Sequence, residues 1–316
     1  MKPLLANRLL LVYLLSFVIA FLVLTLLSAL TGAFLGAQLA INGAEVEDIA
    51  KVVSEKTAAL SADLYQLAMA ITLAGLAFWI YKRYALPLAS KIDWQPATLS
   101  ETTRITAWIL LLAIGYMMFT AWIVPQEYLS GLSDLYGKPQ GPVSVLALLV
   151  SMGILAPLLE EWIFRGFMLR SYTLRRGTVY ALYAQTLIFA IVHCEPVIAL
   201  HALFMGWILG RWVLSGGSLQ SAFYAHAINN LLSLSTAIFI LPHTQSSGQA
   251  NIAIGVLGLA LTLFVLLQVS RQTPFVNLPA QETGPVISGS LVLAITFGLF
   301  LLFTGISDLV AAAGRH

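Results

Sequence analysis

The chain has 316 residues, of which 59% are apolar and only 9% are charged, and its mean hydropathy is +0.89. Soluble domains carry about a quarter charged residues, so this composition excludes an ordinary soluble domain and predicts a polytopic membrane protein. A net charge of +2 excludes the strongly basic surface of a nucleic-acid-binding protein. We therefore expect the lipid bilayer, and no nucleic acid, as a partner.

Apolar runs long enough to cross a bilayer follow one another along the chain. A membrane-spanning helix needs about 17–25 predominantly apolar residues. Such runs lie near 9–36, 62–81, 105–124, 142–164, 179–194, 197–214, 218–241, 251–270 and 286–306. The predicted fold class is therefore all-α, a polytopic membrane helix bundle of eight or nine transmembrane helices. The short fifth run and the last run are the weakest candidates.

The predicted bundle divides into three parts. Residues 1–141 would form three N-terminal transmembrane helices with their loops, residues 142–241 the helices that carry a candidate site, and residues 242–316 one or two C-terminal helices. Between the first two spans, 42–61 carries six charged residues. Its apolar residues recur at helical spacing, which would fit an amphipathic surface helix, but a solvated acidic loop is the favoured interpretation.

Lysine and arginine are unevenly distributed over the predicted loops. With the N-terminus in the cytoplasm, twelve of the 16 basic residues lie on the inner segments. The positive-inside rule therefore favours this orientation. The first apolar run is too long for a signal-peptide core, so we interpret it as a retained span. We expect a multi-pass integral protein of a bacterial-type inner or plasma membrane, with a cytoplasmic N-terminus.

Two adjacent carboxylates and a guanidinium, Glu160, Glu161 and Arg165, interrupt the fourth apolar run. One acid at the centre of a membrane helix costs ~2.5–3.5 kcal/mol, so these charges need a compensating role. Residues four apart share a helix face, which predicts an ion pair between Glu161 and Arg165. Glu160 lies about 100° around the helix and is expected to face a cavity. The alternative, two acids solvated at the cytoplasmic end of a helix, is disfavoured because the apolar pattern continues past them.

Phe189 and His193 are also four apart, so the phenyl ring is expected to pack against the imidazole and fix its direction. By itself, a histidine on an apolar helix is more often a core residue than a catalyst. Gly177 is a natural turn between the fourth and fifth spans. Glu160 precedes this glycine by 17 residues, and His193 follows it by 16. In an antiparallel hairpin both side chains would lie ~24 Å from the turn at 1.5 Å per residue, so the acid and the imidazole would meet.

His226 and Asn230 form a third pair at the same spacing, with Asn229 adjacent. The helical period places the imidazole and the amide on one face of the seventh span. By itself, an asparagine in a membrane interior is typical of helix–helix contact. Together with the first two pairs, this pair predicts one acid, two imidazoles and an amide gathered from three helices.

Two chemistries fit these residues. Glutamate with two histidines is a ligand set of catalytic zinc sites, so Glu160, His193 and His226 would be the ligands if a metal is bound. Without a metal, Glu160 and His193 would draw a proton from water, while His226 and Asn230 would donate hydrogen bonds to the oxyanion of a tetrahedral intermediate. Asparagine is a good oxyanion donor and an unusual zinc ligand. The residues therefore favour a site without a cofactor and leave zinc open.

The three motifs occur in a fixed order on successive predicted helices. Glu160-Glu161-xxx-Arg165, Phe189-xxx-His193 and His226-xxx-Asn230 resemble the CPBP intramembrane protease family, which includes the CAAX prenyl endopeptidases and the bacterial Abi-type proteins. The resemblance covers roughly 142–241. It implies a helical bundle whose site lies inside the membrane and opens toward the cytosol. It also implies hydrolysis of a peptide bond in a membrane-associated protein or peptide, prenylated in the case of the CAAX enzymes.

The resemblance also implies a role for each motif residue. Glu160 and His193 would activate the water, and His226 with Asn230 would form the oxyanion hole. The remaining motif residues, Glu161, Arg165 and Phe189, would support them. The family was first described as metalloproteases, and a glutamate-activated water is the favoured mechanism.

Two rival functions stay open. Intramembrane acids and histidines also mark ion pathways, so a proton-coupled transporter is one rival, although no inverted repeat supports it. A non-catalytic scaffold or immunity-type protein of the same fold is the other. His201 is interpreted as a packed, hydrogen-bonded core histidine. Cys194, the only cysteine, is not expected to face its neighbour His193 as a nucleophile.

Overall fold

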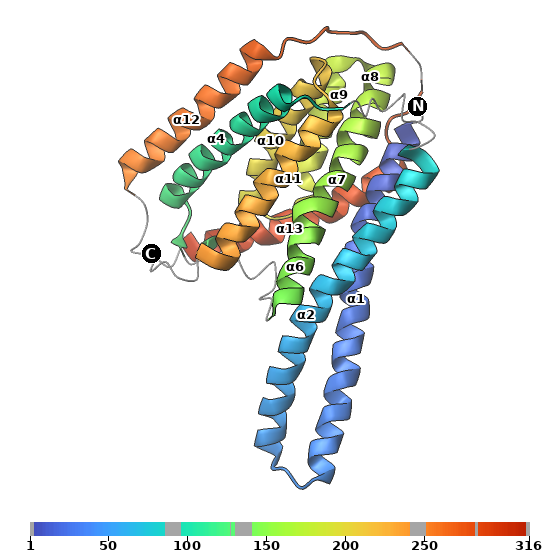
Figure 1. The fold of residues 1–316 in the computed structure, drawn as a ribbon, viewed down its shortest axis with the longest axis vertical. Helices are drawn as coiled ribbons and strands as arrows, with labels where there is room; N and C mark the ends of the chain where they lie inside the picture. Colours follow the sequence, from blue (N-terminus) through green and yellow to red (C-terminus); the bar gives the residue numbers. More distant parts are fainter. Residues whose placement is uncertain are drawn as a thin grey trace.

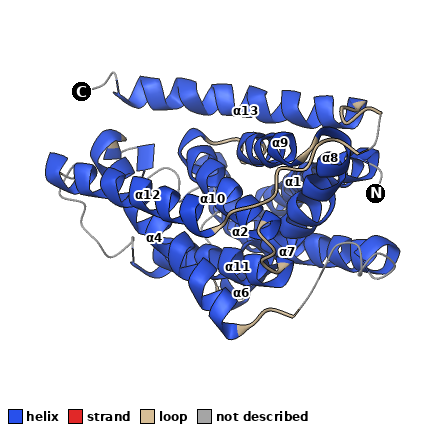
Figure 2. Ribbon diagram, turned by 90° about the horizontal axis from the view of Figure 1, so that it is seen from above, coloured by secondary structure: helices blue, strands red, loops and turns tan. Residues whose placement is uncertain are grey.

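The computed structural model describes residues 3–85, 96–126, 128–129, 141–240, 251–281 and 284–313. All regular secondary structure in these ranges is helical (Figure 2). The α-helices are α1 (Pro3–Ile41), α2 (Val46–Ile80), α4 (Leu99–Ile123), α6 (Pro142–Val150), α7 (Ala156–Glu160), α8 (Arg170–Arg176), α9 (Thr178–Ile191), α10 (Pro196–Leu214), α11 (Leu219–Ser235), α12 (Ile252–Gln272) and α13 (Gly289–Ala313). The predicted all-α class is confirmed.

Six helical segments of the described chain are long and apolar enough to cross a membrane. They are Leu5–Ile41, Leu99–Ile123, Pro142–Arg176, Pro196–Leu214, Ile252–Gln272 and Gly289–Ala313. The predicted spans 62–81, 179–194 and 218–241 correspond to α2, α9 and α11, which are not among the six. Helix α9, with 14 residues, is ~21 Å long, against a hydrocarbon core of about 30 Å. The structure is a helical membrane bundle, and a count of eight or nine spans stays a prediction.

Helices α1 and α2 pair as a long hairpin that projects beyond the other helices (Figure 1). The favoured interpretation of 42–61 as a solvated loop is wrong, because α2 begins at Val46. Two acids stand in its first turn, where they complement the helix dipole. A Cβ at Gly32 or Gly36 would lie within van der Waals distance of Val53 on α2, so these small residues serve packing inside the chain. Packing of the apolar face of α2 against α1 therefore stabilises this helix despite the charged residues in its first turns.

The segment Pro142–Arg176 runs as one helix through the middle of the bundle and contacts α1, α2, α9 and α11. It contains α6, α7 and α8, joined by π-helical turns at Ser151–Leu155 and Glu161–Leu169. Pro157 lacks an N–H for the α-helical ladder, and the first of these wider turns ends just before it. The candidate charged residues thus lie where the helix changes its winding, a feature often seen at functional sites.

The predicted turn at Gly177 is confirmed. Its φ is +84°, a conformation that favours glycine, and a Cβ there would lie 2.7 Å from the Leu278 carbonyl oxygen. The linker between α12 and α13 crosses this turn, because Thr178 N donates to Leu278 O and Leu278 N donates to Thr178 Oγ1, each at 3.0 Å. Figure 2 shows α13 lying across one face of the bundle.

Helices α4 and α12 approach each other at a pair of glycines, which yields a stability prediction. A Cβ at Gly258 would lie 2.6 Å from the Gly115 carbonyl oxygen and 2.6 Å from Phe119 N, so Gly258→Ala must push the helices apart. We expect a cost of about 1–3 kcal/mol, as for other overpacking changes, seen as a lower Tm of the purified protein in detergent. Gly75→Ala on α2 is the control, because nothing lies within 4 Å of that Cβ. Equal Tm values for the two variants would contradict the close contact.

Candidate active site

The centre of the site is a buried ion pair on one turn of the central helix. Arg165 Nη1 lies 2.7 Å from Glu161 Oε1, and both side chains are 0% exposed. His226 on α11 approaches the same oxygen, with Nδ1 2.9 Å from Glu161 Oε1. The predicted pairing of Glu161 with Arg165 is therefore confirmed. A charge buried this deeply needs such partners, since desolvation penalises each ion by several kcal/mol.

The two carboxylate oxygens of Glu160 face residues on two different helices, α1 and α11. Its Oε1 accepts a hydrogen bond of 2.6 Å from the Tyr13 hydroxyl on α1, and its Oε2 lies 3.6 Å from His226 Nε2. The carboxylate was expected to face a cavity and to meet His193, and the structure adds that one of its oxygens is bound by Tyr13. His226 thus stands between the two adjacent acids, with one ring nitrogen toward each.

Tyr13 is a contact that the sequence analysis missed. It lies 147 residues from Glu160 and is 4% exposed. The only signal in the sequence is that it is the single tyrosine of the first apolar run, 9–36. A tyrosine in such a run usually seeks a hydrogen-bond partner when buried, but nothing local says which one.

The phenyl ring of Phe189 on α9 brings the remaining groups together. Its centroid lies 4.6 Å from the His193 ring and 6.0 Å from the His226 ring. The guanidinium of Arg165 stands over the same ring at 4.3 Å. The predicted packing of Phe189 against His193 is confirmed. No hydrogen bond or ion pair joins Glu160 directly to His193 in the described structure.

His193 lies in the turn that follows α9 rather than on the helix. Its Nδ1 is 2.6 Å from the Phe189 carbonyl oxygen. Cys194 next to it has a φ of +63°, a left-handed conformation that is uncommon for a residue other than glycine. Its thiol donates to the Val192 carbonyl at 3.3 Å and so bonds within this turn. The strained backbone of Cys194 therefore lies directly beside His193, and such strain is frequent at functional sites.

Glu195 fixes the far end of this turn. Its carboxylate accepts hydrogen bonds from Val197 N at 3.0 Å and Ile198 N at 2.6 Å, and so caps α10. The Tyr128 hydroxyl donates to the same carboxylate at 2.6 Å. Burial, together with the neighbouring Glu195 carboxylate, raises the pKa of the Tyr128 phenol, so it keeps its proton and stays a donor at neutral pH.

Asn230 is placed apart from the other predicted catalytic residues. It follows His226 by one helical turn, and its Nδ2 donates to the Met152 carbonyl at 3.1 Å. Its Oδ1 accepts from Asn229 Nδ2 at 3.3 Å. No hydrogen bond in the described structure links Asn230 to Glu160 or His193. The structure thus brings His193 and His226 to the Phe189 ring and Glu160 to His226, while Asn230, one turn beyond His226, bonds to Met152.

Several buried polar atoms near this cluster have no hydrogen-bond partner among the described residues. They are Glu161 Oε2, Arg165 Nε and Nη2, His201 Nε2 and Asn229 Oδ1. A buried polar atom without a partner costs about 1–3 kcal/mol, so such atoms attract water or a polar substrate group. The ring of His201 packs at 5.3 Å from Tyr116, as expected for a core histidine, but its free Nε2 departs from the fully bonded one that was predicted.

The residues suggested as zinc ligands were compared with the geometry of a metal site. Among the described residues, no group of three or more His, Cys, Asp or Glu side chains is placed to hold one metal ion. His226 turns one ring nitrogen to Glu161 and the other to Glu160, so it meets the carboxylates themselves. The donor set as arranged here lacks the three convergent protein ligands of a catalytic zinc site and does not fit one.

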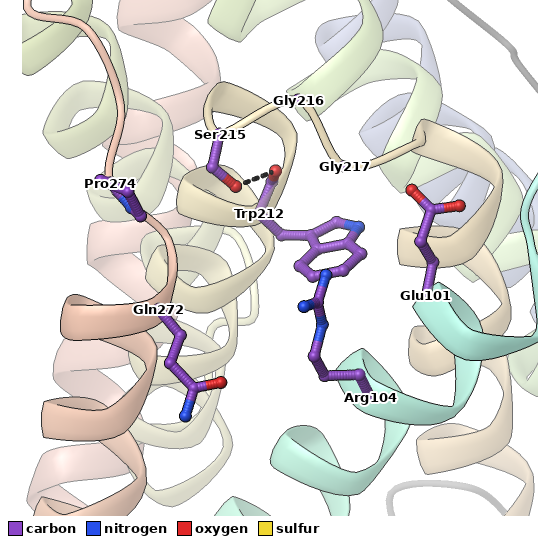
Figure 3. A pocket seen from close by; sticks show the side chains of 8 residues that line it. All are labelled: Glu101, Arg104, Trp212, Ser215, Gly216, Gly217, Gln272 and Pro274. Carbon is purple, nitrogen blue, oxygen red and sulfur yellow. Dashed lines mark hydrogen bonds between the residues drawn. The ribbon is translucent and has the colours of Figure 1, made fainter.

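A separate pocket of about 290 Å³ opens where α4 begins (Figure 3). Its lining includes Glu101 and Arg104 of α4 and Trp212 of α10. The Arg104 guanidinium stands over the Trp212 ring at 4.8 Å. None of the predicted site residues lines this pocket, so it is distinct from the cluster around Phe189.

Residues 142–232 match the family model of the type II CAAX prenyl endopeptidases, described as Rce1-like. This match supports the resemblance of the three motifs to the CPBP intramembrane protease family. The matched residues, called the CPBP segment, make up less than a third of the chain, yet they contain all seven residues of the three predicted motifs. Comparison with curated proteins and with solved structures gives no match.

The family is one of intramembrane peptidases that act on membrane-associated proteins, and the apolar helices show a multi-pass membrane protein. The CPBP segment ends before α12, and it begins after α1, α2 and α4. Tyr13 therefore contacts the segment from outside.

The buried ion pair yields a prediction about stability. Arg165→Met removes the cation and leaves the Glu161 carboxylate buried, which typically costs about 3–5 kcal/mol. We expect a large fall in the Tm measured in detergent. Arg176→Met is the matched control, because Arg176 is exposed and its one hydrogen bond within the described ranges goes to the Arg175 carbonyl. A similar Tm for both variants would show that the ion pair contributes nothing.

Proposed function

We propose that the protein is an intramembrane endopeptidase that hydrolyses a peptide bond of a membrane-associated protein or peptide with an activated water. The observation that carries this proposal is that His193 and His226 pack on the Phe189 ring while Glu160 approaches His226, all inside the segment that matches the CAAX endopeptidase family. An acid and imidazoles buried together in apolar helices are costly, which supports a chemical role for them.

Glu160 would be the general base. Tyr13 already binds Oε1, so Oε2 is the oxygen that would take a proton from water. His193 offers a second acceptor, because its Nδ1 faces the Phe189 carbonyl and therefore carries the ring proton, which leaves the lone pair on Nε2. A water between Glu160 Oε2 and His193 Nε2 would attack the scissile carbonyl carbon and give its proton to Glu160. The same proton would pass to the leaving amine when the C–N bond breaks.

His226 and Asn230 would stabilise the oxyanion of the tetrahedral intermediate. Glu161 Oε1 accepts from Arg165 Nη1 and lies 2.9 Å from His226 Nδ1, so it is Nδ1 of the His226 ring that is placed to donate to this carboxylate. Its Nε2 is then a donor only when the ring is doubly protonated. Asn230 uses one amide hydrogen on the Met152 carbonyl and has a second one for the substrate. Removing one such donor typically lowers kcat by about 10²–10³.

The substrate class is inferred from the family match and not from the shape of a binding groove. The matching family is named for CAAX prenyl endopeptidases, so a prenylated C-terminal peptide is the first substrate to test, beside its unprenylated counterpart. Cleavage of both would assign a broader membrane-peptide specificity. Proton flux without cleavage would assign the transport function instead.

The role of Glu160 is tested by removing its basicity. We expect Glu160→Gln and His193→Ala to lower kcat on a farnesylated fluorogenic CAAX peptide by about 10²-fold or more, since general bases contribute 10²–10⁴. Glu101→Gln is the control, because it removes a carboxylate from the separate pocket while glutamine still suits the α4 capping box. Wild-type rates in Glu160→Gln would defeat the mechanism.

Chelation tests the choice between water activated by residues alone and zinc. We expect cleavage of the same peptide to survive dialysis against EDTA and treatment with 1,10-phenanthroline, because Glu160 and His193 would activate the water without a metal. Activity that disappears with the chelator and returns with zinc would reverse this assignment. Metal analysis of the purified protein accompanies the assay.

A further inference from the structure

The first helix supplies a contact to the proposed base from outside the CPBP segment. Tyr13 and Glu160 are both largely buried, and their hydrogen bond of 2.6 Å joins α1 to the last residue of α7. It is the only hydrogen bond that the Glu160 side chain makes in the described structure, since His226 Nε2 lies 3.6 Å from the other oxygen. The orientation of the carboxylate therefore depends on this hydroxyl.

A single hydrogen bond matters here because of how a glutamate rotates. The last side-chain torsion of glutamate is broad, so the packing of the chain does not by itself fix the plane of the carboxylate. By binding one oxygen, Tyr13 fixes this plane and holds the other oxygen toward His226. The hydroxyl thus sets the direction of the oxygen that the proposed mechanism uses.

Tyr13 is itself held in place. Its ring packs edge to face on Phe17 at 5.0 Å. One and a half turns earlier on α1, Asn7 Nδ2 donates to Val286 O at 2.7 Å and to Ser288 Oγ at 3.1 Å. Asn7 Oδ1 accepts from the Tyr172 hydroxyl on α8 at 2.7 Å. These buried bonds anchor α1 against both the central helix and the beginning of α13.

We propose that Tyr13 is a positioning residue for Glu160, so that the α1 helix completes a catalytic site whose other members lie in residues 142–232. This inference rests on the proposed function, because it assigns Tyr13 a part in the same reaction. Tyr13 acts through Glu160 and touches neither the water nor the substrate. The CPBP segment alone would then lack a correctly oriented base.

The test compares two tyrosine-to-phenylalanine changes. Tyr13→Phe keeps the ring and its contact with Phe17 and removes only the hydroxyl. Tyr172→Phe is the matched control, because it removes a buried hydroxyl that also joins α1 to the central helix, at Asn7 rather than at Glu160. We expect Tyr13→Phe to lower kcat on the farnesylated fluorogenic peptide by about 10–100-fold, the usual effect of removing a residue that orients a reacting group. KM should stay within about twofold because the hydroxyl does not bind substrate.

A merely structural role predicts a different result. It would reduce the Tm and kcat of the two variants alike, since each loses one buried bond between the same two parts of the chain. Equal kcat values for Tyr13→Phe and Tyr172→Phe would overturn the positioning role while leaving the proposed function intact. A wild-type protein that cleaves none of the peptides would instead remove the proposed function.

A double-mutant cycle tests the contact independently of cleavage. Tm is measured for Tyr13→Phe, Glu160→Leu and the double variant. In Glu160→Leu the hydroxyl is left buried without a partner, so adding Tyr13→Phe should not lower Tm further. This non-additivity supports the contact. Additive Tm shifts would overturn the inference, whatever the cleavage assay shows.

Discussion

The structure depends on one buried charge arrangement in the middle of an apolar bundle. Glu161 and Arg165 neutralise each other away from solvent, His226 bonds to the same carboxylate, and the face of Phe189 covers the guanidinium. An ion removed from water is stable only with such compensation, so the helices that supply these groups cannot shift independently. The central helix, α9 and α11 are therefore held in a single register by electrostatics as well as by packing.

Close helix contact makes this arrangement compatible with a compact bundle. At Gly206 on α10 an added Cβ would lie 3.0 Å from the Phe189 ring and 3.6 Å from Arg165 Nη2. A side chain here would have to displace the phenyl ring slightly, so the glycine lets α10 lie close over the phenyl and guanidinium groups. The seal that this glycine permits excludes bulk water, which strengthens each electrostatic interaction inside. The unpartnered atoms beside it, among them Arg165 Nε and His201 Nε2, still provide places for a few water molecules.

In the proposed mechanism the adjacent acids Glu160 and Glu161 have different roles. Glu161 is committed to Arg165 and His226, whereas Glu160 has one oxygen on Tyr13 and one near His226. Two identical side chains at consecutive positions thus meet different surroundings, because the helix turns about 100° between them. The base is then shared between two parts of the chain, the CPBP segment and the N-terminal helix. In this proposal the α1 helix would bear on catalysis through one hydroxyl, that of Tyr13.

The sequence by itself determined what a single helix decides. The pairs Glu161–Arg165 and Phe189–His193 follow from a period of 3.6 residues, and the turn at Gly177 follows from a conformation that glycine adopts easily. The helical class follows from the apolar runs, although the charges of 42–61 concealed the start of α2. Only the tertiary structure decided how helices rotate and approach one another. It joined Tyr13 to Glu160, set His226 between two carboxylates and turned Asn230 to Met152. These contacts link residues 65 to 147 positions apart, and no local periodicity encodes the distance between two helix axes.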